Sequence, residues 1–345
     1  MGDQTRPDVR TPPPGPRSAA LMRRGDDILL GVSLIGGWPP SHFVSRYRDG
    51  WFIEDVDGNR YLDWINGWAS APLGGNHPEL VAAAHQGLKD YGTECLSALR
   101  VEHQWLLAEK LHEIAPPPLT KVVHGTTGSE VVENAVRIMR KAAGPGRPFV
   151  ITFLGSFRGG NYGTRAMGPH NAHDNHAIEP FMSGGLMPLA CTLGSDRMSA
   201  PAGEPCTGGT FAGNSAACLM AAKPLEVMER DKVLDNVAEL EWVANAKFGA
   251  MKDKYEIVGD VRVIGAYMCV EFVEDKGSKA PDHDLTREIV YAMERRGVVP
   301  TYESASNNFR PTPALNQPPK LFAFGRDIVE ECVAEVSKAH AKGVA

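Results

Sequence analysis

Segments with the periodicity of β-strands alternate with segments that have the periodicity of helices along most of this chain. Residues 51–64 alternate apolar and polar side chains around Asp57-Gly58, which is typical of a hairpin. Helical patterns follow over residues 77–92, 101–118 and 129–144, and an apolar run typical of a buried strand covers 147–155. The alternation predicts an α/β fold with a mainly parallel sheet flanked by helices.

The C-terminal part continues the alternation after a weakly patterned stretch. A long helical region covers about 215–255, and residues 261–273 have the pattern of a strand. A helix is predicted over 285–297, with Asp284 as its N-cap, and a final amphipathic helix follows Gly325.

Composition and charge narrow the class of protein. The 345 residues are 43% hydrophobic and 23% charged, which is ordinary for a soluble globular protein. The net charge of -6 gives no electrostatic footprint for nucleic acid or an anionic membrane, and no apolar run is long enough to span a bilayer. The six cysteines are scattered, with no C-x-x-C pair, as expected for reduced thiols in the cytoplasm. Residues 1–24 are rich in proline and lack the apolar core of a signal peptide, so they are expected to form a disordered lead-in.

Two glycine-rich motifs each precede a helical pattern. The first, HGTTGSE, covers residues 124–130, and the second, GGTFAGN, covers 208–214. Small residues allow an anion to approach the backbone, and the first free N–H groups of a helix point toward it. The first motif is therefore a candidate phosphate cradle, although an ordinary capped turn explains it better when it is taken alone. The three glycines of the second motif imply tight backbone packing or left-handed conformations, which a simple loop also explains.

A third candidate is Arg310, in the run FRPTPAL. The planar guanidinium of arginine suits bidentate binding of a carboxylate, whereas many arginines serve only in surface ion pairs.

Taken in order, these motifs resemble the class III pyridoxal-phosphate (PLP) aminotransferases. The resemblance runs from about Ser41 to Gly343 and includes YLDWINGWASAPLGGNHPEL, GTTGSEVVENAVRIMRKA, FLGSFRGG, GGTFAGNSAACLMAAKPLEVM, RVIGAYMCVEFV and FRPTPAL. It implies a fold type I architecture, in which the N- and C-terminal parts form a smaller α+β domain. The implied domains are 25–76 and 223–345 for the small domain and 77–222 for the cofactor-binding large domain.

The resemblance also implies roles for individual residues. Gly128 and Ser129 match the pair that binds the PLP phosphate, and Phe157 matches the aromatic ring that stacks on the pyridine. Thr210 matches the threonine that reaches the phosphate of the neighbouring subunit, which implies a homodimer. Arg310 matches the arginine that holds the substrate carboxylate. The implied reaction transfers an amino group from an amino acid or amine to a keto acid, and aminomutases, decarboxylases and racemases share the same motifs.

The sequence departs from the family pattern between residues 168 and 183. Glu179-Pro180 resembles the end of a family strand. It is followed almost directly by a motif that, in other family members, lies much further along the sequence. The family stretch that carries the pyridine-nitrogen aspartate and the Schiff-base lysine has no counterpart, and no lysine lies between Lys141 and Lys223. Arg158 also stands where the family usually has histidine.

An internal deletion, whether genomic, by splicing or from gene-prediction error, explains this departure. The lysine supplies the covalent anchor and moves the substrate proton. The aspartate keeps the pyridine nitrogen of the cofactor protonated, so that the ring can act as an electron sink. We therefore predict no catalytic residue in this chain, weak non-covalent PLP binding and impaired amino transfer. The alternatives are an inactive dimerisation or regulatory partner of an intact relative, and a deletion product without function.

A histidine-rich stretch near the deletion offers one form of compensation. His170, His173 and His176 could supply a general base or bind a metal, but a polar loop explains them as well, and no metal site is predicted.

Overall fold

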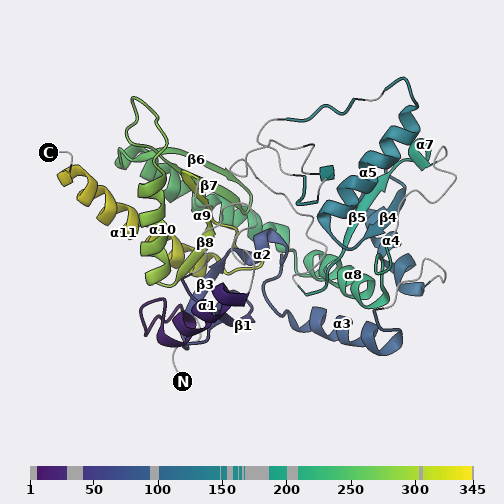
Figure 1. Cartoon of the computed structure of the whole chain (residues 1–345), viewed down its shortest axis with the longest axis horizontal. Coiled ribbons are helices and arrows are strands. Elements are labelled where there is room, and N and C mark those ends of the chain that lie inside the picture. The colour runs from purple at the N-terminus through teal and green to yellow at the C-terminus, as the bar shows by residue number, and fades with distance from the viewer. Residues whose placement is uncertain are drawn as a thin grey trace. The chain divides into compact units, whose positions relative to one another are not determined.

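The computed structural model describes residues 6–28, 42–93, 101–147, 149–153, 158–161, 163–164, 167, 186–199, 209–302 and 306–343. The chain divides into two compact units, whose elements are labelled in Figure 1. Unit 1 comprises Met1–Ala69, Leu73–Gly75 and Lys232–Ala345, and unit 2 comprises Ser70–Pro72 and Asn76–Asp231. The chain therefore passes between units around residues 69–76 and 231–232.

Unit 1 contains a seven-stranded sheet in the order β1-β2-β3-β8-β9-β7-β6. Its strands are β1 (Ser45–Asp49), β2 (Phe52–Asp55), β3 (Arg60–Trp64), β6 (Val258–Ile264), β7 (Tyr267–Phe272), β8 (Val298–Tyr302) and β9 (Asn308–Arg310). Strands β3 and β8 are parallel, and the other neighbouring pairs are antiparallel. The sheet is thus mixed, because each of the hairpins β1–β2, β2–β3 and β6–β7 joins consecutive strands in antiparallel order.

Two hairpins show how local sequence sets this sheet. The predicted hairpin around Asp57-Gly58 is confirmed, since β2 and β3 pair antiparallel and the Asp55 carboxylate accepts from the N–H groups of Asp57 and Asn59 at 2.9 and 2.8 Å. Residues 261–273 form parts of the two strands β6 and β7 rather than one strand. Gly265 lies between them with φ +56°, a left-handed conformation that glycine adopts without steric cost and that reverses the chain.

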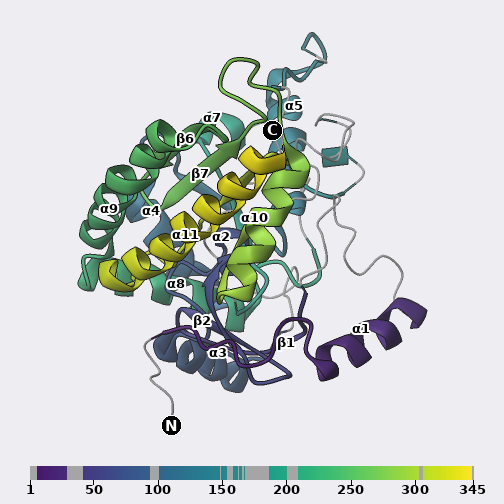
Figure 2. The same ribbon diagram turned by 90° about the vertical axis from the view of Figure 1, so that its left-hand side faces the viewer.

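Three helices cover one face of the unit 1 sheet. Helix α11 (Pro319–Gly343) packs between α9 (Val233–Lys254) and α10 (His283–Arg295), as Figure 2 shows. Helix α10 ends before Gly297 as predicted, but its N-cap is Asp282, whose carboxylate accepts from Leu285 N at 2.9 Å, rather than Asp284.

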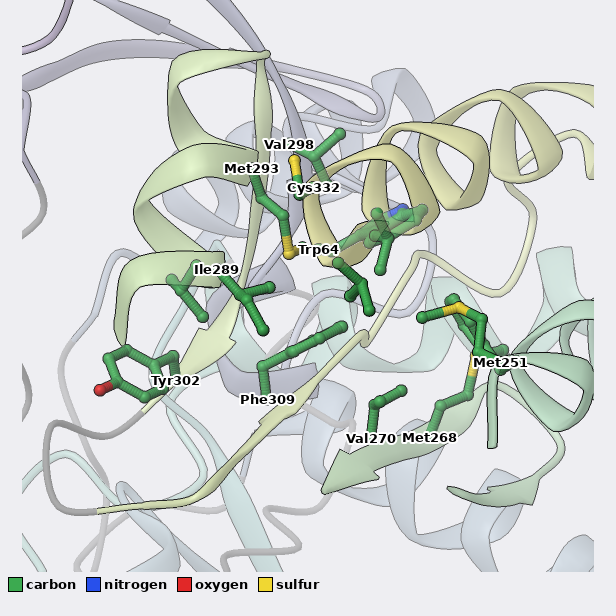
Figure 3. Close-up of a cluster of buried hydrophobic side chains, with 14 of the residues drawn as sticks. Trp64, Met251, Met268, Val270, Ile289, Met293, Val298, Tyr302, Phe309 and Cys332 are labelled. Carbon is green, nitrogen blue, oxygen red and sulfur yellow. The ribbon is translucent and has the colours of Figure 1, made fainter. Parts of the chain in front are cut away.

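The core of unit 1 lies between the sheet and these helices. Figure 3 shows Trp64 of β3, Met293 of α10 and Phe309 of β9 among its members. Trp64 is fully buried, its ring centroid lies 5.1 Å from that of Phe322, and its Nε1–H donates to Gln317 Oε1 at 3.3 Å. Residues distant in sequence therefore join in one packed core.

In place of the disordered lead-in predicted for residues 1–24, residues 6–28 take up defined structure that includes helix α1 (Pro16–Ile28). Asp8 and Arg60 exchange two backbone hydrogen bonds of 2.8 Å. The Asp57 carboxylate accepts from the N–H groups of Arg17 and Ser18 at 2.8 and 2.9 Å, which satisfies two donors at the start of α1. These partners belong to the β2–β3 hairpin, which is distant in sequence, so the composition of residues 1–24 alone does not reveal them.

Unit 2 is mainly helical over the residues described. Its elements are α3 (Pro78–Asp90), α4 (Glu102–Ile114), β4 (Lys121–Gly125), α5 (Gly128–Ala143), β5 (Ala190–Gly194), α7 (Asp196–Ser199) and α8 (Ser215–Arg230). Strands β4 and β5 pair antiparallel as a two-stranded sheet. Helix α8 packs on both α3 and α4. Among the described parts of both units, no helix is long and apolar enough to cross a bilayer.

The apolar run that follows α5 is not a buried strand. Phe149 and Ile151 are 91% and 92% exposed, and Phe153 is 78% exposed. The prediction of a buried strand over 147–155 is therefore wrong for residues 149–153, which belong to no strand. A strand of this composition is buried only where neighbouring strands and covering helices accept it. The described part of unit 2 offers a two-stranded sheet alone.

We expect a charge at Ile151 to leave the folded state almost unaffected. Because this side chain is exposed, Ile151→Asp should change the free energy of unfolding by less than about 0.5 kcal/mol, whereas Ile138→Asp, at a buried position of α5, should cost several times more. Urea unfolding of both variants provides the comparison. A loss of more than about 2 kcal/mol for Ile151→Asp would mean that the segment is packed.

Candidate cofactor site

The start of α5 has the properties of an anion site. Thr127 caps the helix, and its Oγ1 accepts from Glu130 N at 3.2 Å. Within the part of the chain that the structure describes, the N–H groups of Gly128 and Ser129 have no hydrogen-bond partner. A Cβ added at Gly128 would meet no atom within 4 Å, so space is open in front of these donors. Free N–H groups and the positive end of the helix dipole together favour binding of an anion.

The Glu130 carboxylate links this helix start to the second glycine-rich motif. Its Oε2 accepts from Thr126 N at 2.8 Å. Its Oε1 is buried without a hydrogen-bond partner among the described residues, and a Cβ added at Gly209 would lie 2.8 Å from it. The Gly209 backbone therefore lies against the first turn of α5. The spacing Thr127-x-x-Glu130 is the sequence signal of such a cap, and Glu130 is a site residue that the sequence motifs did not single out.

A third motif reaches the same helix. Gly160 N donates to Ser129 Oγ at 2.9 Å, and Thr164 N donates to Glu133 Oε1 at 3.2 Å. Ser129 and Glu133 are four residues apart and lie on one face of α5. The structure thus brings together Gly128, Ser129, Gly209 and the residues that follow Phe157. Phe157 itself lies outside the described residues.

Thr210 lies on an exposed turn at this site. Ala212 N donates to Gly209 O at 3.1 Å, which closes the turn, and Thr210 within it is exposed. Asn214 then caps α8 by accepting from Ala217 N at 2.9 Å. The assignment of Thr210 to a neighbouring subunit's phosphate stays a prediction.

Glu179-Pro180 and the three histidines at 170, 173 and 176 lie outside the described residues. Over the residues that are described, no group of three or more histidine, cysteine, aspartate or glutamate side chains could hold a metal ion.

Arg310 belongs to unit 1, at the end of β9. It is paired with Thr301 of β8 and is 6% exposed. Burial raises the pKa of the Cys269 thiol, whereas the guanidinium groups of Arg262 and Arg310 act on it in the opposite direction. Arg310 of β9 and Cys269 of β7 thus lie on neighbouring strands of the same sheet.

The residues after Arg310 hold a strained turn. Asn66, Gly67, Trp68 and Ala69 (helix α2, Asn66–Ala69) have φ between 49° and 64°, which costs about 1–2 kcal/mol for each residue other than glycine. Thr312 Oγ1 lies 2.6 Å from Trp64 O and 3.1 Å from Ile65 O, within hydrogen-bonding distance of either carbonyl just before this turn. The Asp63 carboxylate accepts from the N–H groups of Ile65 and Asn66 at 3.1 and 2.7 Å. Thr312, two residues after Arg310 in the chain, therefore holds this turn in place together with Asp63.

His124, on β4 just before the helix start, is partly buried, and its Nε2 atom is fully buried. Its Nε2 has no hydrogen-bond partner among the described residues, and burial lowers the pKa of the ring. An uncharged imidazole next to the anion site leaves the helix start as the source of positive potential.

The lowered pKa of His124 predicts a pH dependence of stability. The unfolded state, with a pKa near 6.5, binds a proton that the folded state excludes, so the free energy of unfolding falls as the pH drops below about 6.5. His124→Gln does not titrate and should show a smaller fall. Urea unfolding at pH 7.5, 6.5 and 5.5 tests this, and equal pH dependence in the two proteins would contradict it.

Comparison with known proteins places this arrangement in a family. The sequence model of the family described as Aminotransferase class-III matches residues 38–182 and 174–318. An alanine/serine racemase of Pyrococcus horikoshii is 23% identical over 95% of this chain and 93% of its own length. A 5-aminovalerate aminotransferase of Pseudomonas putida is 26% identical over 86% of this chain and 94% of its own length.

Solved structures show the same fold. A transaminase from the marine bacterium Virgibacillus has a TM-score of 0.81 at 17% identity, over 93% of this chain and 99% of its own. An amine transaminase from an uncultivated Pseudomonas species, solved in a PLP-bound form, has a TM-score of 0.78 at 17% identity, over 86% and 97% of the two chains.

The chain belongs to the class III aminotransferase family. Its fold is that of the fold type I PLP-dependent transferases, which confirms the predicted fold class.

Proposed function

We propose that this chain binds the phosphate group of PLP at the start of α5 without a covalent bond, and that its amino-transfer activity is impaired. The observation that carries the proposal is the pair of free N–H groups of Gly128 and Ser129, beneath open space and beside the Ser129 hydroxyl. These groups fit a phosphate, which needs several donors and gains from the helix dipole. The Glu130 carboxylate is directed to Thr126 N and Gly209. Its negative charge therefore faces backbone groups rather than the free N–H groups of Gly128 and Ser129.

The remaining residues have proposed roles that follow the family. Phe157 stacks on the ring, Thr210 reaches the phosphate of a second subunit, and Arg310 holds a substrate carboxylate. When bound, the cofactor supplies the electron sink on which the family's chemistry depends. The amino donor is an amine or amino acid, the acceptor is a keto acid, and the protein is a homodimer in the cytoplasm.

The proposed impairment rests on what the sequence lacks. Residues 142–222 contain no lysine that could form the covalent link or move a substrate proton. Two features support an internal deletion near residues 168–183. The family model matches the chain twice, and the two matches overlap only at residues 174–182. The alignment with the P. horikoshii racemase runs over 450 positions, so more than a hundred of them stand opposite gaps in a chain of 345 residues.

The experiment compares pyridoxal phosphate with pyridoxal, which lacks the phosphate. Equilibrium dialysis should show reversible binding of pyridoxal phosphate and much weaker binding of pyridoxal, and Ser129→Ala should reduce the difference. Equal affinities for the two compounds would refute the phosphate site. Retention of pyridoxal phosphate through exhaustive dialysis would refute reversible, non-covalent binding.

A second candidate is a regulatory or dimerisation partner of an intact relative. The exposed turn at Thr210, followed by Phe211 at 53% exposure, favours it, because the residue that serves a neighbouring subunit is present while the lysine is absent. Co-expression with an intact class III aminotransferase tests this candidate. Co-purification of a heterodimer would support it, and complete separation of the two chains would count against it. A deletion product without function should show neither association nor phosphate-dependent binding.

A further inference from the structure

We infer that the backbone N–H of Gly160 is a positioning group that orients the Ser129 hydroxyl toward the bound phosphate. This inference rests on the proposed phosphate site. The residue has no side chain, so no functional role follows from its type. Its position relative to Ser129 and α5 is what assigns the role.

The first step concerns the hydroxyl. A serine hydroxyl has one proton to donate and two acceptor sites. Gly160 N donates to Ser129 Oγ at 2.9 Å and so occupies an acceptor site. Among the described residues, Ser129 Oγ donates to no other group, which leaves its proton available. The N–H thereby favours rotamers in which the hydroxyl proton points away from Gly160, and the free N–H groups of Gly128 and Ser129 lie at the same helix start.

The second step concerns how close the loop comes. A Cβ added at Gly159 would lie 2.4 Å from Ser129 Oγ and 2.8 Å from Ser129 Cα, and Gly159 has φ +131°. Both the contact and the conformation require glycine there. The Gly159–Gly160 backbone can therefore lie directly on Ser129, which brings the Gly160 N–H within hydrogen-bonding distance.

The third step concerns what holds the loop. Thr164 N donates to Glu133 Oε1 at 3.2 Å, one helical turn beyond Ser129. A Cβ added at Gly163 would lie 3.0 Å from the same Oε1, so the chain also approaches α5 closely at this second point. Two anchor points on one face of the helix fix the direction of the segment, and with it the Gly160 N–H.

The test removes this N–H. Gly160→Pro lacks the donor, whereas Gly160→Ala retains it, and a Cβ at position 160 meets no atom within 4 Å. The probes are pyridoxamine phosphate and pyridoxamine, each measured by equilibrium dialysis. We expect Gly160→Pro to weaken pyridoxamine phosphate binding by about tenfold to a hundredfold, the range of a hydrogen bond to a charged group, and to leave pyridoxamine binding unchanged. Gly160→Ala should bind both probes as the unaltered chain does.

A double-mutant cycle with Ser129→Ala guards against misfolding. If Gly160 acts through Ser129, then Gly160→Pro should have little further effect in the Ser129→Ala background. Full additivity of the two losses, or unchanged phosphate affinity in a folded Gly160→Pro protein, would overturn the inference. Failure of the proposed function is distinct, because the unaltered chain would then show no preference for pyridoxamine phosphate over pyridoxamine.

Discussion

We expect purified protein of this sequence to transfer amino groups about a hundredfold to ten-thousandfold more slowly than an intact class III aminotransferase. Both proteins are supplied with PLP, an amino donor and a keto acid. This range is the usual contribution of a positioned acid–base group to an enzymatic rate. No lysine lies between residues 141 and 223 to supply that group. Loss of the covalent link to the cofactor adds to the deficit.

The control is an intact family member assayed with the same donor, such as a 5-aminovalerate aminotransferase with 5-aminovalerate. The comparison requires that both proteins bind the cofactor under the assay conditions, which dialysis establishes beforehand. Rates within tenfold of each other would contradict the proposed impairment. They would also show that another group in this chain moves the substrate proton.

Trp64→Ala should lower the free energy of unfolding of unit 1 by about 3–5 kcal/mol. The indole is fully buried in the main core, contacts Phe322, and donates its N–H to Gln317. Truncation removes the buried apolar surface and leaves a cavity, and it also leaves the Gln317 Oε1 acceptor unpaired. Urea unfolding followed by circular dichroism measures the change.

Trp242→Ala is the matched control, because that indole is also in unit 1 but is 73% exposed. Its effect should stay within about 0.5 kcal/mol. Equal losses for the two tryptophans would mean that the packing around Trp64 is not the main source of stability in unit 1.

Local signals predicted much of the fold. The hairpin at Asp57-Gly58 and helix α5 after Thr127 each depend on turn or capping residues that lie within a few positions of the element. Features that depend on partners distant in sequence were not predicted. The run at Phe149–Phe153 has strand composition, yet no described strand pairs with it, and burial depends on such neighbours.

The candidate site likewise contains some features that local motifs predicted and others that depend on contacts between distant residues. Gly128, Ser129 and the Gly209–Thr210 turn were predicted from motifs, and the structure brings the backbones of these segments together at α5. The Gly160 N–H had no sequence signal, because a backbone donor is present at every residue except proline. Its role depends only on where the chain lies. Arg310 was predicted from its motif, whereas its connection through Thr312 to the left-handed turn at Asn66–Ala69 depends on hydrogen bonds between residues about 250 positions apart.

The most direct test of non-covalent cofactor binding is intact-mass measurement on protein of this sequence after incubation with PLP and reduction by borohydride. Reduction makes the bond between the cofactor and a lysine permanent, so a linked cofactor appears as added mass. We expect the protein to bind PLP before reduction and its mass afterwards to remain that of the 37.3 kDa chain. A stoichiometric gain of one phosphopyridoxyl group would contradict it, because a lysine elsewhere in this chain would then have taken the place of the missing one.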